Sequence, residues 1–402
     1  MAKNIKPIRI LIISSVIPIE GSGGGCMAMY RHFILKNDFM IAVASTREFS
    51  HKDIPSLKLN NGYFYKRLKK TRFSRIICNL EYLLNWIVFP INLINFAKKF
   101  KPDLIFSVVD DWHMGLAWRL SRRLCLPLAV NFQDLFALSL FVPRYQKPYP
   151  LVRRFLVHKY FMLNRYADAV FYTSDGMKNW FDTPRGEILY PVGDFEISHY
   201  GNMSISLKQN QSIRLVYAGN CYGAYGDMLL KLIHELMNEP LIEFKIYAVG
   251  NDWSEDIVKQ LTDDEIYYAY LPFDKLCKEL AEADAFLTVM SFVPEERVFM
   301  ETSFTTKWLD YVPFGKPIFV WGPEYSTAIQ FSRRYGSGYA VAEDNPLALI
   351  STIIACKDDP VLWMSLSKGA KQVAENELNS NKIHETFRYK LKQLTVPKTY
   401  LQ

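Results

Sequence analysis

Apolar runs alternate with helical stretches along most of the chain, and this alternation predicts an α/β fold. In the first half, strand patterns fall at 9–15, 39–45, 102–109, 126–134, 169–174 and 187–194. These runs are apolar on both faces and rich in β-branched residues, which is typical of parallel sheets. Helical patterns lie between them at 27–35, 76–97, 114–124 and 149–166. Strand alternating with helix predicts a parallel sheet with right-handed crossovers.

The same alternation resumes after residue 213 and predicts a second domain. Strands are expected at 213–220, 244–250, 266–271, 285–289 and 317–321, with helices at 227–237, 254–261, 273–283 and 306–311. A length of 402 residues also favours two domains over one core. We predict an N-terminal Rossmann-like domain at 1–200, a polar linker at 201–212, a C-terminal Rossmann-like domain at 213–375, and a helix at 376–402 that packs back toward the first domain.

Charge is shared unevenly between the two halves. Residues 1–200 hold 28 Lys and Arg against 15 Asp and Glu, whereas residues 201–402 hold 20 against 26. The net charge of +7 therefore comes from the first half, which favours contact of that half with an anionic surface. No zinc-finger spacing or other nucleic-acid signature accompanies the charge, so we expect no nucleic-acid partner.

A dense basic cluster at 66–75 precedes the amphipathic stretch 76–97. Its asparagines and Pro90 argue against a transmembrane span. One interpretation is a core helix with a solvated basic end. The other is a platform for an anionic membrane surface or a lipid-linked acceptor.

The six cysteines are scattered, with no CxxC pair and no histidines at ligand spacing, so we expect reduced thiols and no metal site. The short basic N-terminus leads into an apolar run too brief for a secretion signal. We therefore expect a cytoplasmic protein, peripheral at the inner face of the membrane if the platform interpretation holds.

Several candidate polar groups follow predicted strands of the first domain. The first strand runs into a glycine-rich loop that includes Gly24 and Gly25, whose backbone could approach a ligand closely. His113 follows the third strand and Asp134 ends the fourth. Because open α/β sheets bind ligands at the carboxyl ends of their strands, these features should share one edge. Either side chain could act as a general base or orient a sugar hydroxyl, although a lone histidine near a helix start is more often structural.

The second domain carries a polar loop, a short helix and a strand over residues 302–321. Ser303, Thr305 and Thr306 are good helix N-cap residues, and a helix start attracts anions. Lys307 adds a positive charge, and Asp310 lies one turn further on, where it could accept hydrogen bonds from a diol. The pattern suits a nucleotide bound by its diphosphate and ribose, but it also fits an ordinary capped helix.

The order and residues of these motifs resemble the group 1 glycosyltransferases, a family 4-like group with the two-Rossmann-domain GT-B fold. The resemblance spans nearly the whole chain and rests on stretches 10–25, 102–113, 172–178, 191–194, 216–220, 247–250, 271–283, 304–311 and 315–317. It implies two mostly parallel sheets that face a central cleft, with the acceptor bound by the first domain and a nucleotide diphosphate sugar by the second. It also implies a retaining reaction without a metal or a cofactor other than this co-substrate.

The resemblance also assigns roles to residues of this sequence. Asp310 would bind the ribose, Thr305, Thr306 and Lys307 the diphosphate, and Gly24 and Gly25 would approach the phosphates from the other domain. His113 would contact the donor sugar, with Asp134 as a second catalytic candidate. The expected donor-binding set is completed by Gly219, Asn220, Tyr222, Leu271 and Ser303.

Two departures from the family pattern leave other functions open. The first of the family's two acidic residues is replaced by Thr302, and the usual Arg and Lys are missing from 219–226, where Asn220, Tyr222 and Lys307 could substitute. The leading hypothesis is a glycosyltransferase that acts on a glycan or lipid-linked acceptor in surface polysaccharide or glycoconjugate synthesis. The alternatives are a catalytically weak nucleotide-sugar-binding partner subunit and a GT-B nucleotide-sugar epimerase.

Overall fold

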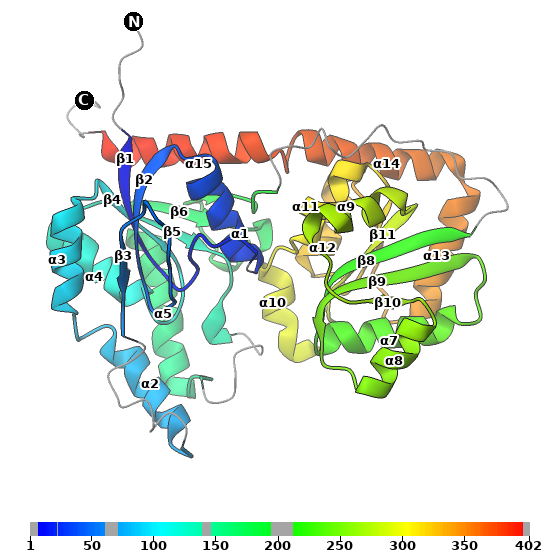
Figure 1. Ribbon diagram of the computed structural model, residues 1–402, viewed down its shortest axis with the longest axis horizontal. Helices are drawn as coiled ribbons and strands as arrows, with labels where there is room; N and C mark the ends of the chain where they lie inside the picture. Colours follow the sequence, from blue (N-terminus) through cyan, green and yellow to red (C-terminus); the bar gives the residue numbers. More distant parts are fainter. Residues whose placement is uncertain (1–6, 22, 61–70, 139–145, 194–211, 397–402) are drawn as a thin grey trace, which may run out of the picture. The chain divides into compact units, whose positions relative to one another are not determined.

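The structure is a computed structural model that describes residues 7–21, 23–60, 71–138, 146–193 and 212–396. The chain forms two compact units (Figure 1). Unit 1 comprises residues 1–192 and 381–402, and unit 2 comprises residues 193–380. The predicted linker at 201–212 lies almost entirely outside the described residues, as does the part of the basic cluster at 66–70.

Unit 1 contains a seven-stranded sheet in the order β3-β2-β1-β4-β5-β6-β7, with every pair parallel. Its strands are β1 (Ile8–Ile13), β2 (Phe39–Ser45), β3 (Ser56–Lys58), β4 (Leu104–Val108), β5 (Leu128–Phe132), β6 (Ala169–Tyr172) and β7 (Glu187–Ile188). Its helices are α1 (Gly24–Tyr30), which continues into a π-helical segment (Arg31–Leu35), α2 (Ser74–Leu84), α3 (Ile91–Phe100), α4 (Met114–Leu124), α5 (Pro150–Tyr166), α6 (Asp175–Trp180) and α15 (Ser380–Thr395).

Unit 2 repeats this topology with six parallel strands in the order β10-β9-β8-β11-β12-β13. The strands are β8 (Ile213–Cys221), β9 (Ile242–Asn251), β10 (Tyr267–Tyr268), β11 (Ala285–Val289), β12 (Ile318–Trp321) and β13 (Tyr339–Val341). The helices are α7 (Ala224–Leu236), α8 (Glu255–Asp263), α9 (Phe273–Glu282), α10 (Arg297–Thr302), α11 (Lys307–Tyr311), α12 (Thr327–Tyr335), α13 (Pro346–Asp358) and α14 (Pro360–Glu375). Two parallel α/β units confirm the predicted fold class.

The predicted helix at 76–97 is wrong as a single element. The structure has α2, then a turn, then α3, which begins directly after Pro90. Proline disfavours helical backbone in the residue before it and fixes its own φ, so the apolar spacing continues while the helix does not. None of the helices in the described ranges combines the length and the apolar character that a membrane crossing needs.

The C-terminal helix α15 packs on the sheet of unit 1 through one phenylalanine. The ring of Phe387 lies 5.4–6.1 Å from the rings of Phe39 on β2, Phe106 on β4 and Phe171 on β6. It also contacts the ring of His32 in the π-helical segment, at 4.4 Å. Edge-to-face aromatic contacts of this kind add to the stabilisation from area burial, so α15 is an integral part of the unit 1 core.

In unit 2, Lys316 caps the carboxyl end of α9. Its Nζ donates hydrogen bonds to the carbonyl oxygens of Leu280 at 3.4 Å and Ala281 at 2.5 Å, and also to that of Ala283. A lysine that binds the last carbonyls of a helix also compensates the negative end of its dipole. The Gly-Lys-Pro stretch at 315–317, which contributes to the family resemblance, therefore holds α9 against β12.

A buried histidine pair joins α15 to the π-helical segment. His32 Nδ1 lies 3.1 Å from His384 Nδ1, and His384 Nε2 lies 2.9 Å from Asp38 Oδ2. The contacts fit two neutral rings, in which His384 donates to Asp38 and accepts from His32. Burial lowers the pKa of His32 well below its usual value, and the neighbouring His384 lowers it further. Burial also lowers the pKa of His384, although Asp38 opposes this effect.

These lowered pKa values predict that acid destabilises unit 1. Below about pH 6.5 the unfolded chain binds protons that the folded pair resists, so stability is lost as the pH falls. The free energy of unfolding should drop by about 1 kcal/mol or more between about pH 7.5 and pH 5.5. In urea unfolding, the free energy of unfolding of the His32→Phe variant should depend less on pH than that of the wild type. The control His158→Asn changes an exposed histidine on α5 and should keep the pH dependence of the wild type. An unchanged pH dependence in His32→Phe would contradict this assignment.

Candidate functional site

Each sheet has one topological switch point, where the strand order reverses. It lies between β1 and β4 in unit 1 and between β8 and β11 in unit 2. In open α/β sheets, ligands bind outside the carboxyl ends of the strands at this point, because the loops diverge there and leave room. The candidate site residues of both units lie on segments that follow these carboxyl ends.

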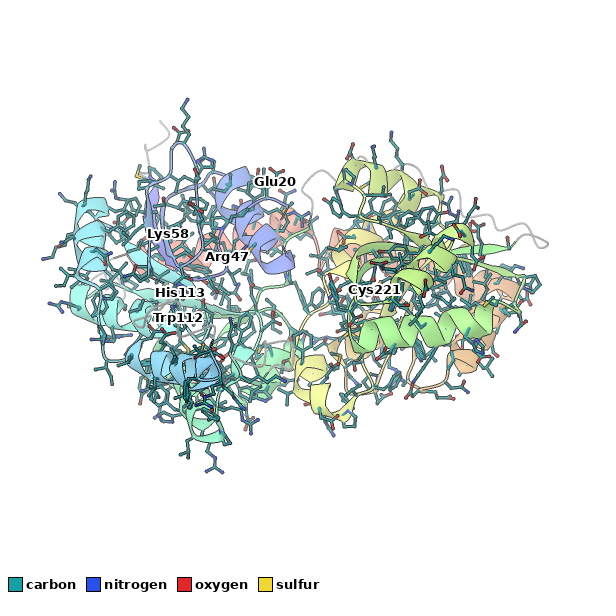
Figure 2. All side chains as sticks on the ribbon, turned by 60° about the horizontal axis from the view of Figure 1, so that its bottom comes forward. Glu20, Arg47, Lys58, Trp112, His113 and Cys221 are labelled. Atoms are coloured by element: carbon teal, nitrogen blue, oxygen red, sulfur yellow. The ribbon has the colours of Figure 1, made fainter. Side chains whose placement is uncertain are left out.

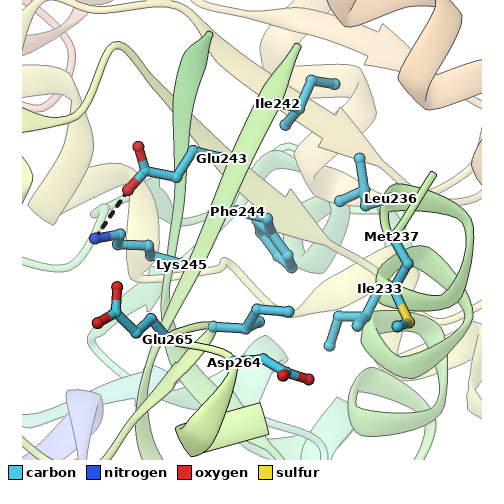
Figure 3. Close-up of a pocket in the computed structure, with 10 residues that line it drawn as sticks. Ile233, Leu236, Met237, Ile242, Glu243, Phe244, Lys245, Asp264 and Glu265 are labelled. Atoms are coloured by element: carbon cyan, nitrogen blue, oxygen red, sulfur yellow. Dashed lines mark ion pairs between the residues drawn. The ribbon is translucent and has the colours of Figure 1, made fainter. Parts of the chain in front are cut away.

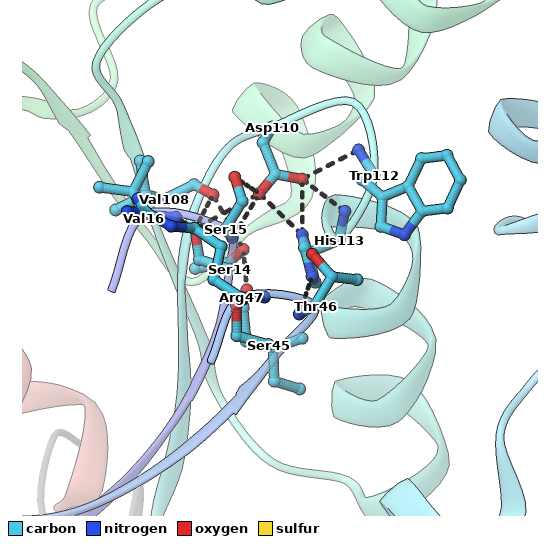
Figure 4. Close-up of polar contacts among 12 residues, drawn as sticks. Ser14, Ser15, Val16, Ser45, Thr46, Arg47, Val108, Asp110, Trp112 and His113 are labelled. Carbon is cyan, nitrogen blue, oxygen red and sulfur yellow. Dashed lines mark hydrogen bonds and ion pairs between the residues drawn. The ribbon is translucent and has the colours of Figure 1, made fainter. Parts of the chain in front are cut away.

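In unit 1, Asp110 ties together the segments that follow β1, β2 and β4 (Figure 4). Its Oδ2 accepts hydrogen bonds from the backbone N–H and the hydroxyl of Ser15, each at 2.7 Å. Its Oδ1 accepts from the N–H of Trp112 at 2.9 Å. Burial alone would raise the pKa of Asp110, but the interactions with His113 and the N–H of Ser15 lower it to about 2. Asp110 is therefore ionised at neutral pH, and its hydrogen bonds hold these segments together.

His113 is part of the same network. The side chain is fully buried, and both ring nitrogens have partners. Nδ1 lies 2.9 Å from Asp110 Oδ2, and Nε2 accepts a hydrogen bond from the backbone N–H of Thr46 at 3.2 Å. Figure 2 shows His113 beside Trp112 within unit 1. In this arrangement His113 links three strand ends, and its catalytic role stays a prediction.

Asp111, which follows Asp110 in the sequence, was not predicted as a site residue. It is only 7% exposed, and its Oδ1 accepts a hydrogen bond from the hydroxyl of Tyr160 on α5. Burial raises the pKa of Asp111 to about 7; the Tyr160 hydrogen bond opposes this rise and the neighbouring Asp110 adds to it. Strongly shifted carboxyl groups at a carboxyl-end edge are functional candidates. In the sequence, the only signal was a second aspartate beside the first.

The glycine loop follows β1 and Asp134 follows β5, and β4 lies between these two strands in the sheet. A Cβ atom at Gly25 would lie 2.2 Å from Oε1 of Gln133, so the flexible end of that side chain would have to shift to admit a larger residue. Gly24 is exposed and begins α1, while Asp134 is half-buried after β5. The close approach that Gly25 permits is to Gln133 within the protein, and the predicted contact with phosphates stays a prediction.

In unit 2, Tyr311 fixes the short helix α11 against the end of β8. The hydroxyl of this buried tyrosine accepts a hydrogen bond from the N–H of Ala218 at 2.7 Å. At the next residue, a β-bulge separates Gly219 from Asn220, and Gly219 has φ +153°. A Cβ atom at Gly219 would lie 2.7 Å from Lys307 Cε and 3.2 Å from Nζ. The missing side chain of Gly219 therefore makes room for Lys307.

The amino group of Lys307 has aromatic neighbours and no hydrogen-bond acceptor within the described residues. Nζ lies 4.9 Å from the ring centroid of Tyr217 and 5.6 Å from that of Tyr225. Burial lowers the pKa of Lys307 to about 8, while Cys221 and Asp310 oppose this effect. A desolvated cation with unused donors is stabilised by an anionic ligand, so this position suits a phosphate group.

The structure places the predicted residue Thr306 at the N-cap of α11, but without the capping hydrogen bond of its side chain. Its backbone angles are helical, because α11 follows a turn of similar backbone conformation. Ser303 is buried at the end of α10, and its carbonyl oxygen accepts from the hydroxyl of Thr327. Thr305, Thr306 and Asp310 are half-buried around Lys307. Since α11 has five residues, the lysine is a better anion ligand than the helix dipole.

The remaining predicted donor-binding residues lie on two segments of unit 2. Asn220 is exposed, and its side chain accepts a hydrogen bond from the N–H of Tyr222 at 3.1 Å. Tyr222 is 46% exposed and packs over Gly250 of β9, where a Cβ atom would lie 2.4 Å from its hydroxyl. Leu271 is half-buried between β10 and α9. Gly219 and Asn220 thus lie in the last residues of β8 and Tyr222 directly follows it, whereas Leu271 follows β10, which β9 separates from β8.

At the position of the missing family acid, Thr302 is buried, and its hydroxyl donates to the carbonyl oxygen of Val298 at 2.7 Å. The adjacent Glu301 forms an ion pair with Arg297 at 2.7 Å, one turn earlier on the same helix. The carboxylate of Glu301 is thus paired on its own helix. Thr302 cannot supply the negative charge that the family pattern places here.

A pocket of about 270 Å³ in unit 2 lies elsewhere (Figure 3). It is formed by α7, the start of β9 and the loop before β10, and it contains the Glu243–Lys245 ion pair. These segments mark the amino ends of the strands, opposite to the edge that carries Lys307. Throughout the described ranges, no group of three or more His, Cys, Asp or Glu side chains could hold a metal ion.

The lowered pKa predicts that Lys307 reacts unusually fast with amine reagents. At about pH 8 roughly half of its amino groups are neutral, compared with less than about 1% for an ordinary lysine. Brief acetylation followed by peptide mass spectrometry should modify Lys307 before the exposed Lys259 on α8. Lys316 is an internal comparison, because burial also lowers its pKa to about 8 while three carbonyl groups hold its Nζ. Slower acetylation of Lys307 than of Lys259 would contradict the assigned environment.

No protein-family model and no curated protein sequence matches the chain. Solved structures do match it in fold. HepE of Anabaena in complex with UDP has a TM-score of 0.67 at 15% identity, over 96% of this chain and 100% of HepE. Sucrose-phosphate synthase of Thermosynechococcus elongatus has a TM-score of 0.65 at 13% identity, over 97% and 99%.

A third similar structure is WaaG, a glycosyltransferase involved in lipopolysaccharide biosynthesis. It has a TM-score of 0.57 at 13% identity, over 94% of this chain and 98% of WaaG. The matches cover nearly the full length of each structure, so both units and their order in the chain are shared. The chain therefore has the GT-B glycosyltransferase fold that the sequence predicted.

Proposed function

We propose that this chain is a glycosyltransferase that moves a sugar from a nucleotide diphosphate sugar to a glycan or lipid-linked acceptor in surface polysaccharide or glycoconjugate synthesis. The observation that carries the proposal is the amino group of the half-buried Lys307, whose pKa is lowered by burial and which has no hydrogen-bond acceptor within the described residues. It lies beside Gly219 at the carboxyl end of β8, where an α/β sheet receives its ligand.

The chemistry of the reaction fits this arrangement. As the bond between the sugar and the diphosphate breaks, negative charge builds up on the leaving group. Lys307 packs beside Gly219, and Tyr311 fixes α11 to the end of β8, so the helix that carries the lysine is in place before the donor arrives. Asp310, one turn after Thr306, is proposed to bind the ribose hydroxyl groups. Structures of the similar HepE hold UDP or UDP-glucose, which supports a nucleotide-sugar donor here.

A reaction without a metal and with retention of configuration is part of the proposal and rests on the family resemblance alone. A thermal-shift screen against UDP, GDP, dTDP, ADP and CMP identifies the donor class, because a ligand that binds only the native state raises its stability. Transfer or hydrolysis of the donor by the purified chain would exclude the partner-subunit alternative, which Thr302 favours. Release of an epimerised sugar without any acceptor would favour the epimerase alternative.

Replacing Lys307 should remove much of the charge stabilisation in the transition state. We expect Lys307→Ala to reduce donor turnover by about 100-fold or more, since a single preorganised donor contributes about 3 kcal/mol. Asp310→Ala should strongly reduce turnover through loss of nucleotide binding. The control Lys259→Ala removes an exposed lysine of the same unit. Wild-type rates in both site variants, with the fold intact, would contradict the proposal.

We further propose that unit 1 binds an anionic membrane surface through α2, α5 and the turn before α3. Figure 1 shows α2 beside α5, and Arg75 joins them by stacking 4.4 Å above the ring of Tyr149. The exposed apolar side chains of this α2–α5 surface are Phe73, Ile76, Leu80, Ile87, Ile91 and Leu151. Residues 71–101 and 146–166 contain ten Lys and Arg and a single acid, the buried Glu81. Apolar groups flanked by cations suit an anionic interface.

Removing two of these apolar groups should weaken binding to vesicles. Ile87 and Ile91 are 69% and 73% exposed, so the double variant Ile87→Ser/Ile91→Ser should fold normally. In sedimentation with phosphatidylglycerol-containing vesicles, its partition coefficient should fall by about tenfold or more. The control Val361→Ser/Met364→Ser changes equally exposed side chains on α14. If the wild-type chain does not bind anionic vesicles at low salt, the proposed membrane-binding surface is wrong.

A further inference from the structure

Asp111 is a buried carboxyl group at the carboxyl end of β4 that the network of Asp110 and His113 does not use. Asp110 and Asp111 are adjacent, and their side chains have different partners. Asp110 bonds Ser15, Trp112 and His113, whereas Asp111 bonds Tyr160 on α5. The two acids therefore serve different parts of the same sheet edge.

Only one oxygen of Asp111 has a partner within the described residues. Oδ1 accepts from the Tyr160 hydroxyl, which in turn accepts from the backbone N–H of Ala137 at 3.1 Å, so this oxygen is firmly oriented. Oδ2 makes no hydrogen bond to any described residue, although the side chain is more than nine-tenths buried. Oδ2 keeps some contact with solvent, so a ligand can reach this oxygen and replace water as its hydrogen-bond donor.

The chemistry of Oδ2 narrows what it could bind. It is an acceptor with a negative neighbour, Asp110, so a phosphate group would be repelled. A metal ion is not favoured either, because the oxygens of Asp110 are already occupied by hydrogen-bond donors. A neutral group that donates a hydrogen bond, such as a hydroxyl, fits the position best.

The surroundings of Asp111 are aromatic. Burial, and then the negative charge of Asp111, raise the pKa of the Tyr82 phenol well above its usual value, so the two side chains interact electrostatically, while the Tyr82 hydroxyl donates to the carbonyl oxygen of Gln146 at 3.0 Å. The ring of Tyr82 lies 5.9 Å from that of the half-exposed Trp112, at an interplanar angle of 75°. Aromatic walls with one well-placed polar group are typical of small-molecule sites, and a sugar ring carries both the C–H faces and the hydroxyl groups that such walls accommodate.

We propose that Asp111 is an acceptor-binding residue whose Oδ2 accepts a hydrogen bond from a hydroxyl group of the acceptor sugar. The inference rests on the proposed glycosyl transfer and names the class of acceptor chemistry that unit 1 recognises: a hydroxyl-bearing sugar unit set against Tyr82 and Trp112. Asp110 and His113 hold the strand ends in place, and Asp111 contacts the ligand.

This assignment makes acceptor binding depend on pH. The ionised carboxylate is the better hydrogen-bond acceptor, so affinity should fall as the pH drops through the pKa of Asp111, which is about 7. The ionisable groups that interact with it are Asp110, which adds to the rise in the Asp111 pKa, Tyr160, whose hydrogen bond opposes this rise, and Tyr82, whose own pKa is raised by the charge of Asp111. Removing the Tyr160 hydroxyl should therefore raise the pH at which half of the acceptor affinity is lost.

The test is a titration of the full chain with methyl glycosides of glucose, galactose, mannose, rhamnose and N-acetylglucosamine, monitored by saturation-transfer NMR with and without UDP. We expect at least one glycoside to bind, and Asp111→Asn to weaken it by about tenfold or more, because a hydrogen bond to a charged group is lost. The control Asp53→Asn, which changes an exposed acid of the same unit, should bind normally. Tyr160→Phe should keep the binding but shift its pH midpoint upward.

Three outcomes would overturn the proposal: no glycoside binds the wild-type chain, Asp111→Asn binds as tightly as the wild type, or the midpoint in Tyr160→Phe does not move. Tyr160→Phe keeps the carboxyl group, so the proposal stays testable even if Asp111→Asn does not fold. Thermal shifts with nucleotides on the same samples report unit 2 separately. A chain that binds glycosides but no nucleotide would contradict the glycosyltransferase proposal and leave the Asp111 assignment standing.

Discussion

The close contact between Gly219 and Lys307 is the constraint on which the candidate donor site depends. A side chain at Gly219 would collide with the lysine, and the β-bulge after Gly219 gives this residue a φ that favours glycine. The hydrogen bond from Ala218 to Tyr311 fixes α11 at the same place from the other side. Together they hold an amino group at the end of β8, with two tyrosine rings beside it and no hydrogen-bond acceptor within the described residues. The protein thus bears the cost of desolvating this cation before any ligand is bound.

The carboxyl edge of unit 1 is organised by a different principle. Here the polar groups mostly satisfy one another, since Asp110 and His113 bond the backbone after β1, β2 and β4. This network fixes the geometry of the edge and uses both ring nitrogens of His113. Asp111, the next residue, points to other partners and keeps one oxygen unpaired within the described ranges. The rigid network and the unsatisfied carboxyl group are complementary, because a precise binding group needs a well-supported backbone beneath it.

The fold was predictable because it depends on periodicity, whereas the site depended on contacts that periodicity does not encode. The alternation of apolar runs and helical spacing located α4 at 114–124 and most strands, but it joined α2 and α3 and missed the short edge strands β3 and β13. Lys307 was found from its position after a run of hydroxyl residues. The sequence does not show why residue 219 is a glycine, because the contact between Gly219 and Lys307 joins positions 88 residues apart. Asp111 was missed because both adjacent aspartates are buried, and only the packed unit shows that Asp110 is fully bonded while one oxygen of Asp111 is left without a partner within the described residues.

Local charge at each candidate site opposes the overall charge of the half of the chain that carries it. Residues 201–402 are acidic in sum, yet the desolvated group at the end of β8 is a lysine; residues 1–200 are basic, yet the unpaired group at the end of β4 is an aspartate. Exposed charges set the long-range field and are screened by salt, whereas a buried charge acts at close range in a medium of low dielectric constant. Under the proposals above, the surface of unit 1 attracts an anionic membrane while Asp111 selects a neutral hydroxyl, and the acidic composition of unit 2 does not prevent Lys307 from binding a diphosphate. Net charge alone assigns neither ligand; burial of single groups at the strand ends does.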